Sequence, residues 1–297
     1  MQFDVVATNP PFQDSTNKKK TQHKLWIEFT QRAFDQWLKP EGILLQVSPN
    51  SFLSPSNKIL KLMQQKDVKY LRLDTERYFP KVGSTFADYL IYNRLSDKKT
   101  EIIVNDNTFE QTLDSTIFYL PNDISKESLE IHKKTIFNIT NKLNVKYDYV
   151  TCHNTLIHRN DFISRTKTEN HIHPIFHTNA QVWYSRVRQD WSNKKKVMWS
   201  RSGYTKPFYD DCFYGGTDMV YYVLVADDTS GYNLASNLNT KLMKYIFKTA
   251  KWSGFGNEKL FCSLPDLPTD CAMSDSQMYE LFNLTKEEQS YVENYMG

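Results

Sequence analysis

The chain has 297 residues, of which 40% are hydrophobic and 24% charged, so it is long enough for one large domain or two ordinary ones. Its formal net charge is only +3, which excludes a protein that binds nucleic acid through bulk charge alone. Aromatic residues reach 14%; many of these rings will fill cores, but rings beside local basic groups also suit nucleic acid.

The cysteines indicate a reducing environment. No two of them form a Cys-x-x-Cys pair, and a chain of this size does not need disulfides. No apolar run approaches the roughly 20 residues of a membrane span, and no signal peptide opens the chain. We therefore expect a soluble protein of the cytoplasm.

Residues 1–97 alternate between strand-like and helix-like patterns. Short apolar runs predict strands at residues 3–8, 43–47, 70–73 and 86–92. Apolar residues at helical spacing between Leu25 and Trp37 predict an amphipathic helix, and a second helix is expected at residues 55–65. This order predicts an α/β layer that ends in a hairpin.

The remainder differs in character. Residues 98–150 are polar, with a helix-like stretch at 126–143, and form either a linker or the start of a second domain. Residues 151–297 form that domain, which we expect to be α+β. Its predicted elements are strands at 181–184, 196–200 and 219–225 and a helix at 238–247. The tail at 276–296 is also predicted to be helical, and a helix start is expected within it near Thr285.

The most informative residues are Asn9, Pro10, Pro11 and Phe12, which follow the first buried strand. Ligands of open α/β sheets bind at that edge. The Asn9 side-chain oxygen and the Pro10 carbonyl can each accept a hydrogen bond from an exocyclic amine, and the prolines hold both acceptors in place. Phe12 can stack on a base rotated out of the double helix.

These residues resemble the catalytic motif of N6-adenine DNA methyltransferases of the TaqI and Eco57I type. The resemblance continues through Leu25-Trp26-x-x-Phe29, Leu38-Lys39-Pro40-x-Gly42-Ile43, Ser48-Pro49-Asn50-Ser51-Phe52-Leu53 and Phe79-Pro80-x-Val82-Gly83-Ser84-Thr85-Phe86. More weakly, Lys195–Gly203 and Trp252–Pro265 resemble the target-recognition region of that family.

The resemblance implies a fold and a set of roles. Residues 1–97 would be the C-terminal half of a Rossmann-like methyltransferase sheet, and residues 151–297 a DNA target-recognition domain. Asn9, Pro10, Pro11 and Phe12 would bind the base and catalyse transfer, using S-adenosyl-L-methionine as methyl donor. An aromatic residue of the last hairpin would also hold the base, and Phe86 and Tyr89 are both candidates.

The cofactor-binding half of that family is not recognisable in the sequence. Its glycine loop follows a strand and opens a helix, and neither Gly215-Gly216 nor Gly254-Phe255-Gly256 has that context. Without that half, residues 3–8 would form an exposed aliphatic edge. We therefore expect either a second chain that supplies the cofactor half or a sequence that is truncated or started late.

Basic residues suggest contacts with double-stranded DNA. The candidates lie after the catalytic turn and in the densest basic and aromatic stretch, and they are Lys18, Lys19, Lys20, Arg186, Arg188, Lys196, Arg201 and Tyr204. A metal site at His171, His173 and His177 is not expected, because no cysteine pair accompanies them and Pro174 interrupts the pattern.

Two alternatives remain at the level of sequence. A non-catalytic DNA-binding or specificity subunit would retain an unused pocket. Other amino-group methyltransferases, acting on RNA or protein, share an Asn-Pro-Pro-aromatic turn, but they usually lack a large C-terminal domain. A guanine-specific enzyme would tend to carry histidine where this chain has Gln13.

Overall fold

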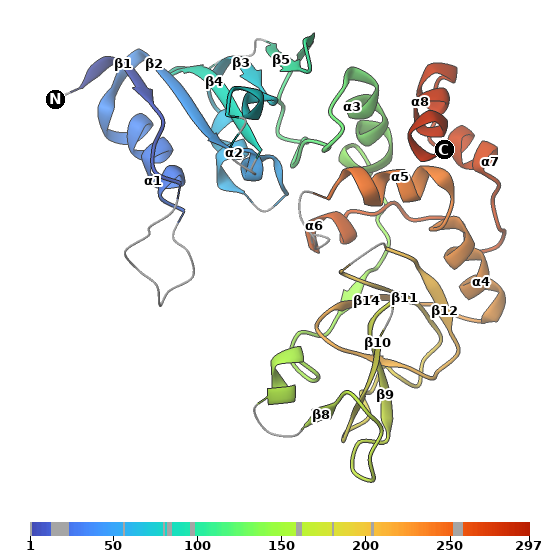
Figure 1. Ribbon diagram of the computed structural model, residues 1–297. Coiled ribbons are helices and arrows are strands. Elements are labelled where there is room, and N and C mark those ends of the chain that lie inside the picture. Colours follow the sequence, from blue (N-terminus) through green and yellow to red (C-terminus); the bar gives the residue numbers. More distant parts are fainter. Residues whose placement is uncertain are drawn as a thin grey trace. The chain divides into compact units, whose positions relative to one another are not determined.

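The computed structural model describes residues 2–12, 24–55, 57–79, 81, 85–95, 99–158, 162–179, 181–202, 205–251 and 258–297. The chain divides into two compact units (Figure 1), the first made of residues 1–120 and 124–126 and the second of residues 121–123 and 127–297. The first unit therefore extends beyond the expected boundary at residue 97.

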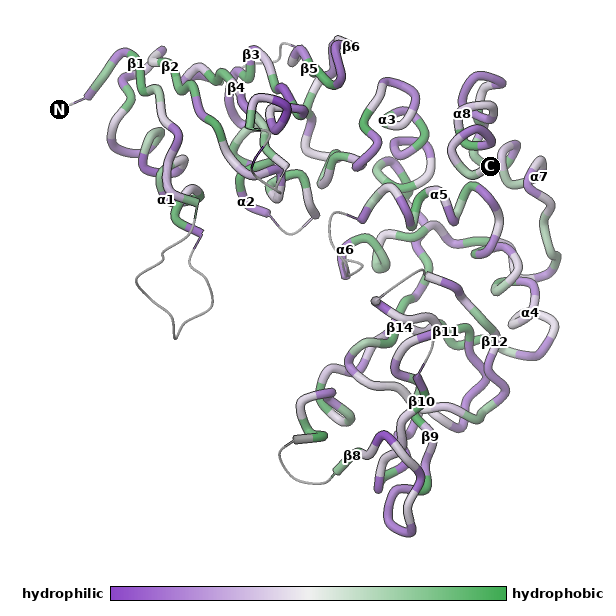
Figure 2. Tube along the Cα trace, in the orientation of Figure 1, coloured by the Kyte–Doolittle hydropathy of each residue, from purple (hydrophilic) through white to green (hydrophobic). Residues whose placement is uncertain are grey.

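A mixed six-stranded sheet forms the first unit, with strand order β1-β2-β4-β3-β5-β6. The strands are β1 (Phe3–Thr8), β2 (Leu38–Pro49), β3 (Asp67–Arg72), β4 (Phe86–Tyr92), β5 (Thr100–Val104) and β6 (Asn107–Gln111). β1 runs parallel to β2, whereas β4 lies antiparallel between β2 and β3. The expected α/β architecture is confirmed, and the hydrophobic stretch of β2 is visible in Figure 2.

Helices and turns that bury apolar side chains connect these strands. They are α1 (Leu25–Arg32), its continuation η1 (Ala33–Trp37), η2 (Asn50–Leu53), α2 (Lys58–Met63) and η3 (Thr75–Tyr78). Trp26 of α1 packs edge-on against Phe52 of η2 at 6.3 Å, and Phe52 packs against Tyr89 of β4 at 5.7 Å. All three side chains are buried, so they form part of the core beside the sheet.

β1 is the edge strand of this sheet, as the sequence led us to expect. Phe3 and Val5 are 47% and 57% exposed, and Leu45 on the neighbouring β2 is 40% exposed. An aliphatic edge strand with unpaired backbone groups is a template for pairing with another polypeptide.

The hairpin β5–β6 was not predicted, because residues 98–150 were assigned to a linker or to the second domain. Asn105 and Asp106 join the two strands, with φ of 47° and 65°. Positive φ at both central residues is the geometry of a type I′ turn, which asparagine and aspartate tolerate. β5 pairs in parallel with β3, so the sheet continues past Asp97.

Two four-stranded sheets and several helices make up the second unit. One sheet has the order β13-β9-β10-β8 and the other β12-β11-β14-β7. Their strands are β7 (Lys146–Tyr147), β8 (Ile163–Ser164), β9 (His173–Thr178), β10 (Gln181–Ser185), β11 (Lys196–Ser200), β12 (Phe208–Asp210), β13 (Gly215–Gly216) and β14 (Val220–Leu224).

The helical elements are α3 (Lys126–His132), η4 (Lys133–Phe137), η5 (Asn154–His158), α4 (Asp228–Asn237), α5 (Lys241–Thr249), α6 (Glu258–Phe261), α7 (Asp275–Leu281) and α8 (Lys286–Met296). The helix expected at residues 238–247 instead begins at Lys241, after a break that separates it from α4. Thr285 and Glu288 form a capping box at the start of α8, which confirms the predicted helix start.

Within the described residues, no helix is both long and apolar enough to cross a membrane.

Candidate active site

The turn at the end of β1 lies at the carboxyl edge of two parallel strands. Thr8 is paired with Gln46 of β2, so the chain leaves the sheet beside Val47. Pro10 is buried and Phe12 half-buried, whereas Asn9 and Pro11 are exposed. Because a proline ring fixes φ, the two prolines restrict this turn to few conformations.

A cavity of about 190 Å³ opens beside this turn, lined by Asn9, Phe12, Val47, Phe79 and Phe86. Asn9 and Phe12 come from the turn, Val47 from β2, Phe79 from the segment after η3, and Phe86 from the start of β4. Apolar and aromatic walls with a single convergent amide are suited to a flat ring that carries a polar edge. The structure brings Asn9 and Phe12, both predicted from the sequence as site residues, to one cavity.

Phe86 connects the aromatic walls of this cavity. Its ring centroid lies 5.3 Å from that of Phe12 and 5.7 Å from that of Phe79. Phe86 itself is 4% exposed, while Phe12 and Phe79 are half-buried. The two half-buried rings therefore present surface to the cavity, and Phe86 supports both.

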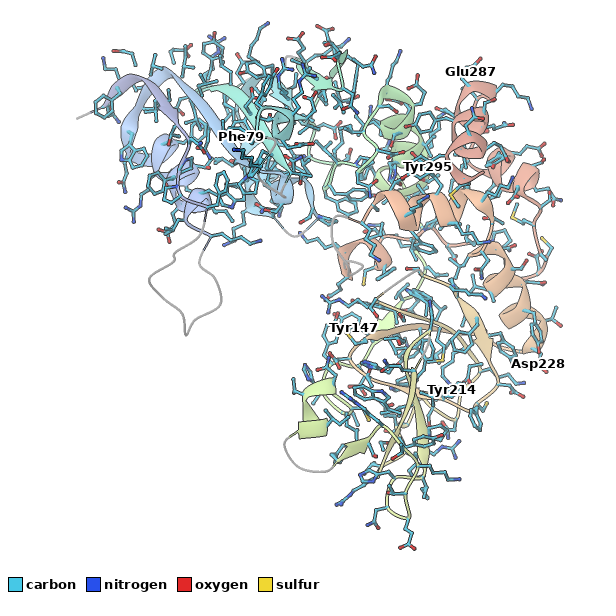
Figure 3. All side chains as sticks on the ribbon, in the orientation of Figure 1. Phe79, Tyr147, Tyr214, Asp228, Glu287 and Tyr295 are labelled. Carbon is cyan, nitrogen blue, oxygen red and sulfur yellow. The ribbon has the colours of Figure 1, made fainter. Side chains whose placement is uncertain are left out.

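Glu76 holds the segment that carries Phe79. The backbone N–H of Phe79 donates to the Glu76 carbonyl at 2.8 Å, and the Phe86 N–H donates to the Glu76 carboxylate at 3.1 Å. One residue thereby ties η3 to the start of β4. Figure 3 shows Phe79 beside the sheet of the first unit.

Two hydrogen-bond acceptors of the turn are unused. Within the described part of the chain, neither the Asn9 side chain nor the Pro10 carbonyl has a hydrogen-bond partner. Of the two, the Asn9 side chain lines the cavity and is therefore available to a ligand amine. An amide oxygen and a carbonyl oxygen accept without carrying charge.

The two candidates from the last hairpin, Phe86 and Tyr89, lie on opposite faces of β4, since side chains alternate along a strand. Phe86 lines the cavity, whereas Tyr89 is fully buried against Phe52. Burial raises the pKa of the Tyr89 hydroxyl to about 12. Of the two candidates, the structure therefore brings Phe86 to the cavity and not Tyr89.

Phe79 was not among the candidate site residues, although the motif that contains it was singled out. The sequence pattern of β4 led to candidates on the strand itself, Phe86 and Tyr89. Phe79 opens the motif that resembles the family's loop before the last hairpin, and only the folded chain brings its ring to Phe86. An aromatic directly before a loop that returns into a strand is the signal that was available.

The residues expected to contact DNA differ in how exposed they are. Arg186 and Arg188 are exposed, and Arg201 is half-buried. Arg188 donates from Nε to the Ser192 hydroxyl at 3.1 Å. Lys18, Lys19, Lys20 and Tyr204 lie outside the described residues.

The prediction that Lys196 contacts DNA is wrong, because its side chain is fully buried and cannot reach a DNA phosphate. Its ammonium lies 2.6 Å from the Asp210 carboxylate, and both side chains are buried. It also donates to the backbone carbonyls of Ser192 and Lys194. The basic pattern around it in the sequence did not distinguish an internal ion pair from a surface charge.

The histidines considered as metal ligands make other contacts. His171 hydrogen-bonds Thr168 at 2.7 Å, and His177 hydrogen-bonds Thr217 at 2.9 Å while stacking on Trp183 at 3.8 Å. The part of the chain that the structure describes holds no cluster of three metal-ligating side chains.

Gly215 and Gly216 do not lie in a glycine-rich loop of the kind that binds a cofactor. Gly215 and Gly216 form the strand β13, and the Gly216 N–H donates to the Gln189 side chain at 2.7 Å. A Cβ at Gly215 would clash with that same side chain, so these glycines permit close packing instead of contacting a ligand. Gly254, Phe255 and Gly256 lie outside the described residues.

Comparison with known proteins gives a family for the N-terminal part. Residues 1–79 match the Eco57I restriction-modification methylase family. The resemblance that the motifs predicted is thereby confirmed for these residues, which include Asn9, Phe12 and Phe79. No match was found among curated proteins.

Several solved structures are similar at low identity. The M protein of the type I restriction enzyme EcoKI is 19% identical over 35% of this chain and 25% of its own, with a TM-score of 0.29. The type IIL restriction-modification enzyme MmeI, solved in complex with DNA, is 8% identical over 94% of this chain and 48% of its own (TM-score 0.48). The DrdV protein of a DrdV–DNA complex is 11% identical over 98% and 44%, respectively (TM-score 0.49). The chain spans less than half the length of each.

Proposed function

We propose that this chain is the base-binding and DNA-recognition part of a site-specific DNA adenine-N6 methyltransferase. The observation that carries the proposal is the cavity of Asn9, Phe12, Phe79 and Phe86, in which the unpaired Asn9 amide lies beside aromatic walls. The match of residues 1–79 to a DNA methylase family supports the same reading.

The chemistry follows from the weak nucleophilicity of the adenine amine, whose lone pair is conjugated with the ring. In the proposal, an adenine rotated out of the duplex enters the cavity with its ring between Phe12 and Phe79. The Asn9 oxygen and the Pro10 carbonyl accept the two amine protons. This draws the nitrogen toward tetrahedral geometry and makes its lone pair available for attack on a methyl group.

The acceptors act because they are positioned before the base arrives. Asn9 follows a hydrogen-bonded strand and precedes two prolines, so little reorganisation accompanies binding. The apolar walls exclude water, which would otherwise compete for the amine protons. Phe86, buried beneath both half-buried rings, fixes the spacing between them.

A second part of the proposal concerns the methyl donor. The family match implies S-adenosyl-L-methionine, and neither Gly215-Gly216 nor Gly254-Phe255-Gly256 has the sequence context of its usual glycine loop. We infer that either a second chain or a segment preceding the given sequence holds the donor and pairs with the exposed edge of β1. The sheet order supports this inference, because β1 ends at the proposed catalytic turn and its outer edge is unpaired. Residues 127–297 would then supply target recognition.

Substitution Asn9→Ala tests the proposal. Removing the acceptor should lower methyl transfer by the reconstituted complex by about 100-fold or more, while DNA affinity stays unchanged. Both are measured on the same duplex, transfer with a labelled methyl donor and affinity by fluorescence anisotropy. Asn144→Ala is the matched control, since Asn144 is exposed and does not line the cavity.

Unchanged methyl transfer in the Asn9→Ala protein would show that the cavity takes no part in catalysis. The chain would then act as a DNA-binding or specificity subunit.

A further inference from the structure

Lysines occupy every position of α5 that is not buried. Lys244 and Lys248 are exposed and Lys241 is half-buried, whereas the remaining residues of α5 are buried. The resulting alternation of hydrophilic and hydrophobic residues is visible along α5 in Figure 2. The solvent face of an ordinary helix carries charges of both signs, and this one carries only positive charge.

These lysines border a cavity of about 350 Å³, here called the lysine cavity. Lys206, Lys244, Lys248 and Lys251 line it together with the apolar side chains of Phe247 and Met296. No acidic residue is among the described residues that line it. A concave site with several ammonium groups and a partly apolar wall concentrates positive potential toward a ligand.

Three of the lysines that line this cavity carry charges that no ion pair among the described residues neutralises. Lys241, which does not line the cavity, pairs with Glu293. By contrast, Lys206, Lys244 and Lys248 form no ion pair in the described ranges. The Lys248 ammonium lies 4.6 Å from the ring centroid of Tyr295 (labelled in Figure 3), a contact that leaves its charge intact.

Stabilisation of the helix end explains only part of this arrangement. Cations near a helix C-terminus are favourable, which accounts for Lys248 in the last turn and Lys251 just beyond it. Lys206 precedes β12 and Lys244 lies in the middle of α5, so the helix end does not explain them. Like charges that share one cavity repel each other, and a bound anion would relieve that repulsion.

We propose that the lysine cavity binds a backbone phosphate of duplex DNA. The proposal rests on the proposed function, since it assumes that DNA is the ligand of this chain. Lysine ammonium groups are common phosphate contacts, and such contacts position DNA without reading its sequence.

A neighbouring cavity favours a polymer over a free nucleotide. Lys206 also lines a second cavity of about 420 Å³, together with Thr178, Gln181 and Tyr214. Amide side chains such as Gln181 suit the edges of bases. A strand that places a phosphate on Lys206 could therefore continue into a site with hydrogen-bonding and aromatic groups.

The test is the salt dependence of DNA binding. The double variant Lys244→Gln/Lys248→Gln should bind a labelled duplex about tenfold or more weakly at moderate salt. The slope of log affinity against log salt should fall by roughly one unit, because one phosphate contact is lost. The charge-matched control is Lys142→Gln/Lys286→Gln, which replaces two exposed lysines that do not line the cavity.

Each outcome separates this inference from the proposed function. If the wild-type chain binds no duplex, the proposed function fails and this inference with it. If the wild type binds and the double variant keeps the same slope, only the lysine cavity is overturned. Calorimetric titration with adenosine monophosphate covers the other phosphate source: binding that is lost in the double variant while duplex binding persists would assign the cavity to a free nucleotide and overturn the DNA reading.

Discussion

At the scale of single residues, two aromatic side chains of β4 have different roles: Phe86 lines the cavity, whereas Tyr89 is buried in the core. Replacing Phe86 with leucine should lower methyl transfer, because the ring supports both Phe12 and Phe79. Removing only the Tyr89 hydroxyl with Tyr89→Phe should leave transfer unchanged, since that side chain is buried away from the cavity. Steady-state kinetics of both variants, with thermal unfolding as a check on folding, decides between them. Equal losses in kcat/KM would contradict the assignment of Phe86.

Lys196 should affect stability instead of DNA binding. Replacing it with methionine leaves the Asp210 carboxylate buried without its counter-ion, and we expect a loss of about 3 kcal/mol in the free energy of unfolding. Denaturant titration measures this loss. At a temperature where the variant is folded, its DNA affinity should equal that of the wild type. A stable variant with weakened DNA binding would restore the original assignment.

His132 gives the second unit a predictable response to acid. Complete burial lowers its pKa to about 3, and its Nε2 hydrogen-bonds Thr249 at 2.8 Å. As pH falls below about 6.5, the histidine of the unfolded chain binds a proton that the folded chain does not accept, so stability is lost at about 1.4 kcal/mol per pH unit. Between pH 7.5 and 5.5 the wild type should lose about 1.4 kcal/mol more than His132→Gln. Equal losses in chemical denaturation would show that His132 is not kept neutral.

At the scale of elements, β1 is exposed along the edge that leads to the catalytic turn. Val5→Lys places a charge on that edge, and because Val5 is 57% exposed the stability of the chain should change by less than about 0.5 kcal/mol. Association with the polypeptide that holds the methyl donor should be lost. Co-purification measures this, and Thr108→Lys on β6, at the opposite edge of the same sheet, is the control. Retained association in Val5→Lys would contradict pairing through β1.

The elements also show what the sequence could predict. β1, β4 and β11 were predicted at or near their observed bounds, because apolar runs bounded by turns mark buried strands. The β5–β6 hairpin was missed, since its strands are short and its turn residues, Asn105 and Asp106, were read as linker. Positive φ at adjacent Asn and Asp is readable from sequence only when the flanking strands are recognised first.

At the scale of the whole molecule, local chemistry was easier to predict than contact between distant segments. The Asn9 to Phe12 turn follows from four adjacent residues. The cavity needs Phe79 and Phe86, which reach it only through the antiparallel placement of β4 between β2 and β3. The buried pair of Lys196 and Asp210 likewise depends on the pairing of β11 with β12, which composition does not indicate.

The boundary between the two units was also only partly predictable from the sequence. The sequence indicated a change of character after residue 97, whereas the structure puts the division near residues 120–127. Two compact units agree with an organisation in which one binds the base and the other recognises DNA, which is what the proposed function requires.

The central claim is that the turn after β1 presents two neutral acceptors to the amine of an extruded adenine. The most direct measurement is mass spectrometry of nucleosides from DNA exposed to the assembled enzyme, which does not require the recognition sequence. We expect N6-methyladenine with the wild-type chain and about a hundredth of that amount or less with Asn9→Ala. N4-methylcytosine as the product, or N6-methyladenine at undiminished levels with Asn9→Ala, would contradict it.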